Sequence, residues 1–227
     1  MNNITKRFGP TEALKGVDFD VGDQEIVGVV GDNGAGKSTL MNIICGYLNQ
    51  TEGEIRFKGE EISNYGVADR RRKLGIETVY QDKALGVEQS VVRNFFMVRE
   101  ITDRFGFLDL DAMKEEVMKV LDDIGFLRIG DPERKVKYLS GGERAGIAIA
   151  RAMYFDSDLL IMDEPTIALS LKETQKILDF IEQAKSEGIS TIVVSHAIDT
   201  IYPIIDRAVV LELGEKILDK PKEETDR

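Results

Sequence analysis

The stretch GDNGAGKST, residues 31–39, limits most strongly what this chain can fold into. It matches the pattern G-x-x-x-x-G-K-[ST], whose glycines let the backbone wrap closely around phosphate oxygens and aim its N–H groups inward. An apolar stretch, residues 25–30, precedes the loop, and the helix-like stretch KSTLMNIICGYL follows it. Because a strand, a glycine-rich loop and a helix in this order form a phosphate-binding unit, the sequence predicts an α/β nucleotide-binding domain.

Within this loop, Lys37 is predicted to place its ammonium on the β- and γ-phosphates, and Ser38 to ligate magnesium through its hydroxyl. The N-terminus of the following helix adds the positive end of its dipole. The predicted phosphate-binding residues are Gly31, Asp32, Asn33, Gly34, Ala35, Gly36, Lys37, Ser38 and Thr39.

Polar residues end three further apolar stretches. Asp163 and Glu164 stand at the end of LLIMDE, and Gln81 stands at the end of ETVYQ. His196, the one histidine of the chain, stands at the end of TIVVSH. The carboxyl ends of parallel strands meet at the phosphate-binding edge of a sheet. We therefore expect Asp163 to hold magnesium, Glu164 to deprotonate the attacking water, His196 to read the γ-phosphate, and Gln81 to touch magnesium or the water. Two alternatives are an N-cap role for the acids and a purely structural histidine.

Continuous apolar stretches that alternate with helical ones predict a parallel sheet covered on both faces, with an antiparallel β layer beside it. The predicted strands are VDFDV (17–21), EIVGVV (25–30), GEIRFKG (53–59), IETVYQ (76–81), DLLIMD (158–163), ISTIVVSH (189–196) and RAVVLELG (207–214). Helices are expected over residues 110–126, after LSGG and over 171–188. We predict one domain, residues 1–227. Its nucleotide-binding core would comprise residues 1–85 and 153–227, and its purely helical subdomain residues 86–152.

Composition narrows the function. The net charge of −11 argues against nonspecific nucleic-acid binding, and the basic run DRRRK, residues 69–73, is interpreted as a solvated helix face. Apolar runs are too short to span a bilayer, and MNNITKRF lacks a signal-peptide pattern, so a cytoplasmic chain is expected. The single cysteine, Cys45, excludes an internal disulfide and is expected to be a small buried helix residue.

A second glycine-rich turn, LSGGE at residues 139–143, precedes another helix. Together these motifs resemble the nucleotide-binding subunit of ABC transporters over nearly the whole chain. GDNGAGKS resembles Walker A, LLIMDE resembles Walker B, LSGGE resembles the signature, and Gln81 and His196 resemble the Q-loop glutamine and the switch histidine. ITKRFG resembles the region whose aromatic residue, here Phe8, stacks on adenine.

The resemblance implies a magnesium-dependent ATPase with a P-loop NTPase core that forms a head-to-tail ATP dimer. Ser140, Gly141 and Gly142 of the signature would then bind the nucleotide held by the partner copy. The other implied partners are the membrane permease subunits and, indirectly, a solute-binding protein, with the chain on the inner face of the membrane. Residues 82–100 are expected to include the permease docking surface. Phe95 and Phe96 motivate this, and core packing of the helical subdomain is the expected role of at least one of them.

The phrases NGAGKSTLM and IETVYQ are typical of the branch that imports simple sugars. An exporter or lipid-transport ATPase is the alternative, and a non-transport ABC ATPase is a more distant one. Three positions depart from the family pattern. Ser170 replaces an aspartate, Glu143 replaces the signature glutamine, and the first strand is shorter than usual, which suggests an abridged N-terminus.

Overall fold

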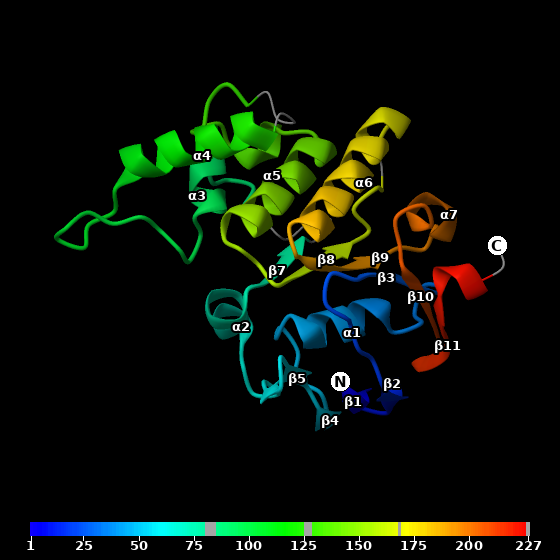
Figure 1. Ribbon diagram of the computed structural model, residues 1–227. Coiled ribbons are helices and arrows are strands. Elements are labelled where there is room, and N and C mark those ends of the chain that lie inside the picture. Colours follow the sequence, from blue (N-terminus) through cyan, green and yellow to red (C-terminus); the bar gives the residue numbers. More distant parts are fainter. Residues whose placement is uncertain (80–84, 125–128, 168, 226–227) are drawn as a thin grey trace.

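Six strands form the central sheet of the computed structural model, which describes residues 1–79, 85–124, 129–167 and 169–225 (Figure 1). The strand order is β11-β10-β3-β9-β8-β7, and every neighbouring pair is parallel except β10 and β11, which form an antiparallel hairpin. These strands are β3 (Ile26–Val30), β7 (Ile76–Val79), β8 (Leu159–Asp163), β9 (Ser190–Val194), β10 (Arg207–Glu212) and β11 (Glu215–Pro221). The comparisons reported below confirm the predicted α/β class.

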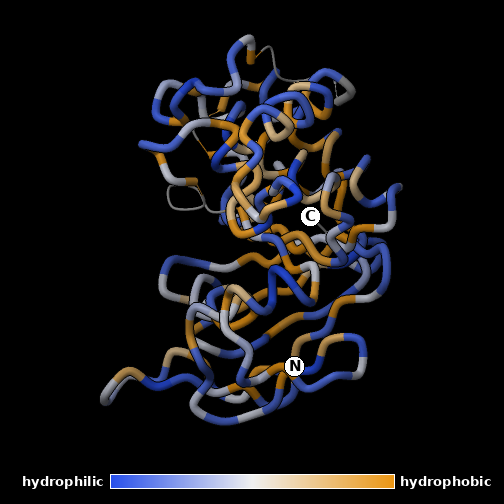
Figure 2. Tube along the Cα trace, turned by 90° about the vertical axis from the view of Figure 1, so that its left-hand side faces the viewer, coloured by the Kyte–Doolittle hydropathy of each residue, from blue (hydrophilic) through white to orange (hydrophobic). Residues whose placement is uncertain are grey.

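Helices cover both faces of this sheet, so its central strands are apolar throughout. On β3, Val27 and Val29 face a core that includes α1 (Lys37–Ile44), whereas Ile26 and Val30 face the core with α5 (Gly141–Tyr154) and α6 (Leu171–Ser186). Figure 1 shows α1 on one side of the sheet and α5 and α6 on the other. Along the chain trace, hydrophobic segments run through the middle of the molecule (Figure 2).

A smaller antiparallel layer lies below α1 in Figure 1. It consists of β1 (Asn2–Phe8), β2 (Thr11–Val17) and β4 (Glu52–Glu54), with the β5–β6 hairpin (Arg56–Phe57 and Glu60–Glu61) beside it. The predicted strand over residues 17–21 is wrong beyond Val17. Phe19 exchanges backbone hydrogen bonds with Met1, and side-chain contacts flank this pair: the Asp18 carboxylate accepts the Asn3 amide at 2.6 Å, and the Asp20 carbonyl accepts Arg207 Nη2 at 2.7 Å.

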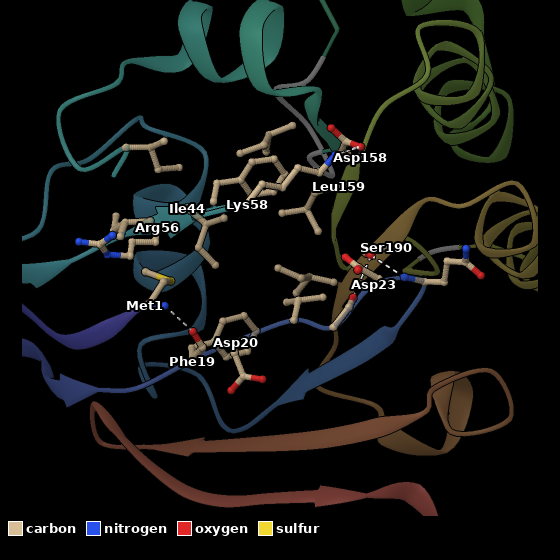
Figure 3. Close-up of a pocket in the computed structure, with 18 of the residues that line it drawn as sticks. Met1, Phe19, Asp20, Asp23, Ile44, Arg56, Lys58, Asp158, Leu159 and Ser190 are labelled. Carbon is tan, nitrogen blue, oxygen red and sulfur yellow. Dashed lines mark hydrogen bonds and ion pairs between the residues drawn. The ribbon is translucent and has the colours of Figure 1, made fainter. Parts of the chain in front are cut away.

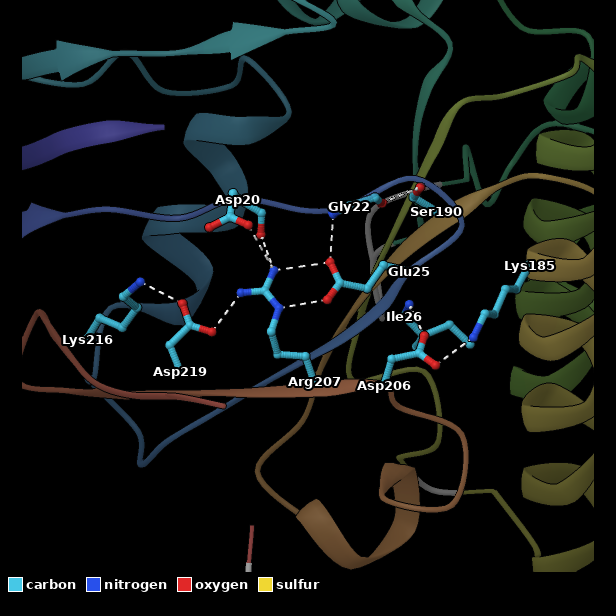
Figure 4. A network of polar contacts seen from close by, with 10 residues as sticks. All are labelled: Asp20, Gly22, Glu25, Ile26, Lys185, Ser190, Asp206, Arg207, Lys216 and Asp219. Carbon is cyan, nitrogen blue, oxygen red and sulfur yellow. Dashed lines mark hydrogen bonds and ion pairs between the residues drawn. The ribbon is translucent and has the colours of Figure 1, made fainter. Parts of the chain in front are cut away.

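Arg207 is the centre of a polar network at the amino edge of the sheet (Figure 4). Its guanidinium contacts Glu25 at 2.7 Å and Asp219 at 2.6 Å, and the hydrogen bond with Glu25 raises the pKa of Arg207. Asp206 accepts the Ile26 amide at 2.7 Å. The network therefore fixes the start of β3, the strand that delivers the glycine-rich loop.

The predicted helical region contains α3 (Val91–Phe95), α4 (Leu110–Ile124) and α5, but it is not purely helical. Isolated bridges join Ser90 to Lys135 and Thr102 to Leu108. The region has its own apolar core, whose buried members lie between Val91 and Ala150. The same region also contains the short helix η1 (Val136–Tyr138), and shorter helical elements elsewhere are α2 (Val67–Leu74), α7 (Ile198–Ile201) and η2 (Lys222–Glu224).

The basic run forms a solvated face only in part. Arg70 is 1% exposed, and its guanidinium donates to four backbone carbonyls, including Ile43 and Ile44 at the end of α1. Arg71 pairs with the buried carboxylate of Glu77 at 2.9 Å. Arg72 is exposed. A buried guanidinium needs such acceptors, and residues distant in sequence provide them, so the prediction of a solvated face is wrong for Arg70 and Arg71.

Candidate nucleotide site

The glycine-rich loop leaves the carboxyl end of β3 and leads into α1. Gly34 and Gly36 have φ values of 87° and 105°, which favour glycine, and a Cβ on Gly36 would lie 2.9 Å from the Ala13 carbonyl. Around Gly34 a Cβ would meet nothing within 4 Å, so the loop is open on that side. Gly36 is the N-cap of α1 and provides no side-chain cap, which leaves the first amides of this helix available to a phosphate.

Lys37 is the first residue of α1 and is 7% exposed. Its ammonium donates to the Gly31 carbonyl at 2.5 Å and to the Asp32 carbonyl at 3.0 Å, so it is held over the loop. Since an ammonium has three protons to donate, these two contacts leave one for a phosphate oxygen. This geometry suits the role predicted for Lys37.

Asp163 ends β8, and Glu164 follows it at the same edge of the sheet. Burial and the neighbouring charge of Glu164 raise the pKa of Asp163, while Lys37 lowers it. Glu164 has a left-handed backbone with φ of 53°, and its amide donates to the Val194 carbonyl of β9 at 2.9 Å. A non-glycine residue in this conformation is strained, and such strain is concentrated at functional sites.

His196 lies beside Glu164. Its Nδ1 is 2.8 Å from Glu164 Oε1, and its backbone amide donates to the same oxygen at 2.9 Å. The His196 side chain is 53% exposed, whereas the second Glu164 oxygen is buried and has no hydrogen-bond partner among the described residues. The histidine is therefore not a core residue. The structure places it on the acid that follows Asp163, a contact that the sequence did not predict.

The second glycine-rich turn begins α5. Ser140 is its N-cap and accepts the Glu143 amide at 3.2 Å, while the Glu143 carboxylate accepts the Ser140 amide at 2.7 Å. Ser170 forms the same capping box with Glu173 at the start of α6. Sequence reasoning treated Ser170 and Glu143 only as departures and missed Glu173, although S-x-x-E at 140–143 and 170–173 is the signal of a capping box.

Residues 14–167 match the family model of the ABC transporter. The chain is 41% identical to the xylose/arabinose import ATP-binding protein XylG of Sulfolobus acidocaldarius, over 99% of this chain and 88% of that protein. The chain belongs to the ABC transporter family. It is also 38% identical to the fructose import ATP-binding protein FrcA of Rhizobium meliloti, over 94% of this chain and 84% of that protein.

Longer relatives of this ABC chain exist. It is 37% identical to the ribose import ATP-binding protein RbsA of Caldanaerobacter subterraneus over 94% of its own length but only 42% of that protein.

Solved cassettes share the fold of this ABC chain. A nucleotide-free ATP-binding cassette matches with a TM-score of 0.83 at 27% identity, over 98% of this chain and 91% of that one. A dimeric bacterial cassette matches with a TM-score of 0.81 at 27% identity, over 97% of each chain. A cassette in its ADP conformation matches with a TM-score of 0.80, again at 27% identity, over 98% of this chain and 91% of that one.

Phe8 is the residue of the cassette predicted to stack on adenine. Phe8 ends β1 and is 47% exposed, with Lys6 Nζ 5.1 Å from its ring centre. Its ring is accessible for stacking, but no contact joins it to the glycine-rich loop in the part of the chain that the structure describes. Gln81 lies outside the described residues.

Both phenylalanines that motivated the permease docking prediction lie in the core, which confirms the core-packing alternative and leaves neither ring for docking. Phe95 and Phe96 are both 0% exposed, and their rings pack edge to face with centroids 5.2 Å apart. Tyr154, the last residue of α5, and Phe155, its C-cap, complete the aromatic cluster. They anchor α3 on α5, because large aromatic side chains gain most from burial.

A separate cavity of about 590 Å³ lies at the opposite edge of the sheet, where Ile76, Leu159 and Ser190 begin their strands (Figure 3). Its floor is apolar, and Lys58 and Asp158 pair at 2.5 Å on its rim. None of the predicted site residues lines it among the described residues. The cavity is thus distinct from the nucleotide site.

Proposed function

We propose that this chain is the ATP-hydrolysing subunit of a membrane ABC importer for a simple sugar. The observation that carries the ATPase assignment is the Glu164–His196 pair beside the glycine-rich loop. Sugar import is favoured over the export alternative because the xylose/arabinose and fructose import proteins align over nearly the whole chain.

The residues of the site fit ATP with magnesium. The uncapped start of α1 and the Lys37 ammonium favour a polyphosphate, and the unpartnered Glu164 oxygen favours a proton donor such as water. Ser38 and Asp163 would hold Mg²⁺, with Gln81 as a further ligand; hydroxyl and carboxylate oxygens suit this ion. When bound, Mg²⁺ neutralises charge on the β- and γ-phosphates.

In the proposed reaction, the loop amides and Lys37 fix the triphosphate, which positions the γ-phosphorus for in-line attack. Glu164 accepts a proton from the attacking water as the new oxygen–phosphorus bond forms, and the bond from the γ-phosphorus to the β–γ bridging oxygen breaks, which releases ADP and phosphate. His196 holds the Glu164 carboxylate through Nδ1 and keeps its exposed ring at the phosphate end of the site. Phe8 would stack on the adenine ring.

The proposed assembly contains two copies of this chain in head-to-tail contact, each offering Ser140, Gly141 and Gly142 to the nucleotide of the other. The dimeric cassette at 27% identity supports the pairing of two copies. The complex would include permease subunits on the inner face of the membrane and, indirectly, a solute-binding protein. In the described residues, no helix is long and apolar enough to cross a bilayer.

The test measures phosphate release and ATP binding by Glu164→Gln. Gln preserves the shape of Glu164 but cannot accept the proton, so turnover should fall about 100-fold or more while ATP affinity stays within about twofold. Near-normal turnover would overturn the assignment of Glu164 as general base. For the sugar, reconstitution with permease and binding protein encoded beside this chain should give ATP-dependent uptake of a pentose or hexose.

A further inference from the structure

We propose that Glu143 and Glu173 set the ATP concentration at which two copies pair, because their carboxylates compete with the partner's γ-phosphate for the signature turn. The inference rests on the proposed function, in which residues 140–142 bind the nucleotide held by a second copy. It assigns a regulatory role to two acids that the family resemblance leaves without one.

The Glu143 carboxylate already occupies a donor of this turn. Its Oε2 accepts the Ser140 amide at 2.7 Å, and the Ser140 hydroxyl is engaged in return by the Glu143 amide at 3.2 Å. An incoming phosphate that uses the Ser140 amide must displace this carboxylate. A phosphate that binds only the Ser140 hydroxyl or the glycine amides is still repelled by the negative charge of Glu143, because this residue lies in the first turn of α5.

Glu173 brings a second negative charge to the same turn from α6. A Cβ built on Gly142 would lie 3.5 Å from Glu173 Oε1, so this oxygen faces the second glycine of the signature. The other oxygen, Oε2, is held by the amide and hydroxyl of Ser170 at 3.0 and 2.8 Å. Two adjacent capping boxes thus place two carboxylates around one predicted anion site.

Because each dimer contains two such turns, the repulsion acts twice during pairing. Replacement of either glutamate with glutamine removes one charge per turn and keeps an oxygen that can accept the capping amide. We expect each substitution to lower the ATP concentration for half-maximal dimerisation by about threefold to tenfold, and the double variant by more. Added salt should shrink the difference, because it screens exposed charges.

The experiment uses Glu164→Gln as the parent, since blocked hydrolysis allows an ATP dimer to accumulate. Glu143→Gln and Glu173→Gln are added to it, and dimer formation is followed by sedimentation velocity across an ATP titration at low and high NaCl. The matched control is Glu182→Gln, which removes the same charge from an exposed position of α6, nine residues and about 14 Å beyond Glu173. ATP affinity of the monomer, measured by calorimetry, should not change.

The outcomes separate the two claims. A parent that never dimerises with ATP contradicts the proposed assembly itself. A parent that dimerises while Glu143→Gln and Glu173→Gln leave the midpoint unchanged, or shift it no more than Glu182→Gln does, overturns this inference alone. A shift toward lower ATP that fades with salt, at an unchanged melting temperature, supports it.

Discussion

Arg70 should be one of the residues on which folding depends most, even though it lies in a run of charges. Its guanidinium donates to the carbonyls of Ile43, Ile44, Ile62 and Tyr65 at 2.5–2.9 Å, and two of these are among the last carbonyls of α1. Hydrogen bonds to a charged group contribute about 1.5–3 kcal/mol each. Four would lose roughly 6–12 kcal/mol if they were independent.

The net loss is smaller for two reasons. Burial of the guanidinium has a desolvation cost, which also lowers the pKa of Arg70, and Arg70→Met removes that cost. The methionine side chain also fills part of the space. We expect the free energy of unfolding to fall by about 3–5 kcal/mol. Urea denaturation followed by circular dichroism measures it, and Arg72→Met, on the exposed neighbour, is the control, with a loss below about 0.5 kcal/mol. Equal losses in the two variants would refute the assignment of Arg70 as a buried cap of α1.

Three further substitutions test the site and the core. Lys37→Ala should weaken ATP binding by about 10–100-fold in calorimetry, and an unchanged affinity would contradict the phosphate role. Asp163→Asn should raise the melting temperature at pH 7. The pKa of Asp163 is raised in the folded protein, so ionisation of this carboxyl destabilises the fold at any pH above its ordinary pKa of 3.8. The gain should vanish below pH 3.8, and a gain that persists there would exclude this cause. Phe95→Ala should cost about 3–5 kcal/mol in urea denaturation, whereas a stable variant that lost only permease coupling would restore the docking prediction.

Local patterns predicted the parts of the molecule that local physics determines. Each of these parts has a continuous signal in the sequence. The loop has its glycine pattern, the buried strands β8 and β9 have apolar runs of strand length, and the helix α6 has helical periodicity. Because parallel strands share one carboxyl edge, the placement of Glu164 and His196 at the same edge followed from their positions at strand ends, 32 residues apart.

The errors concern residues whose environment comes from distant segments. Residues 18–21 have the alternation of a strand, but Arg207 of β10 engages the Asp20 backbone and side chain instead. Arg70 has a charged side chain, which favours a surface position, but it is buried because carbonyls at the end of α1 and near α2 converge on its guanidinium. The docking role considered for Phe95 needs an exposed ring, but α5 covers it. Apart from Ile62 and Tyr65, which lie within eight residues of Arg70, these partners are at least 26 residues away along the chain, beyond a local sequence window.

The starts of three helices differ in a way that fits the proposed assembly, in which one glycine-rich turn binds nucleotide alone and the other needs a second copy. At α1 the N-cap is Gly36, with no side-chain cap and no acid in the first turn, so the helix dipole and amides remain for an anion. At α5 and α6, Ser140 and Ser170 form capping boxes, in which a glutamate carboxylate accepts the N-cap amide and the serine hydroxyl accepts the N3 amide. The start of α1 is therefore open to a phosphate, whereas the start of α5 is already partly occupied by its own side chains. Binding at the signature must replace contacts that the monomer already makes, so it should require the fixed triphosphate and the buried surface that only a partner brings.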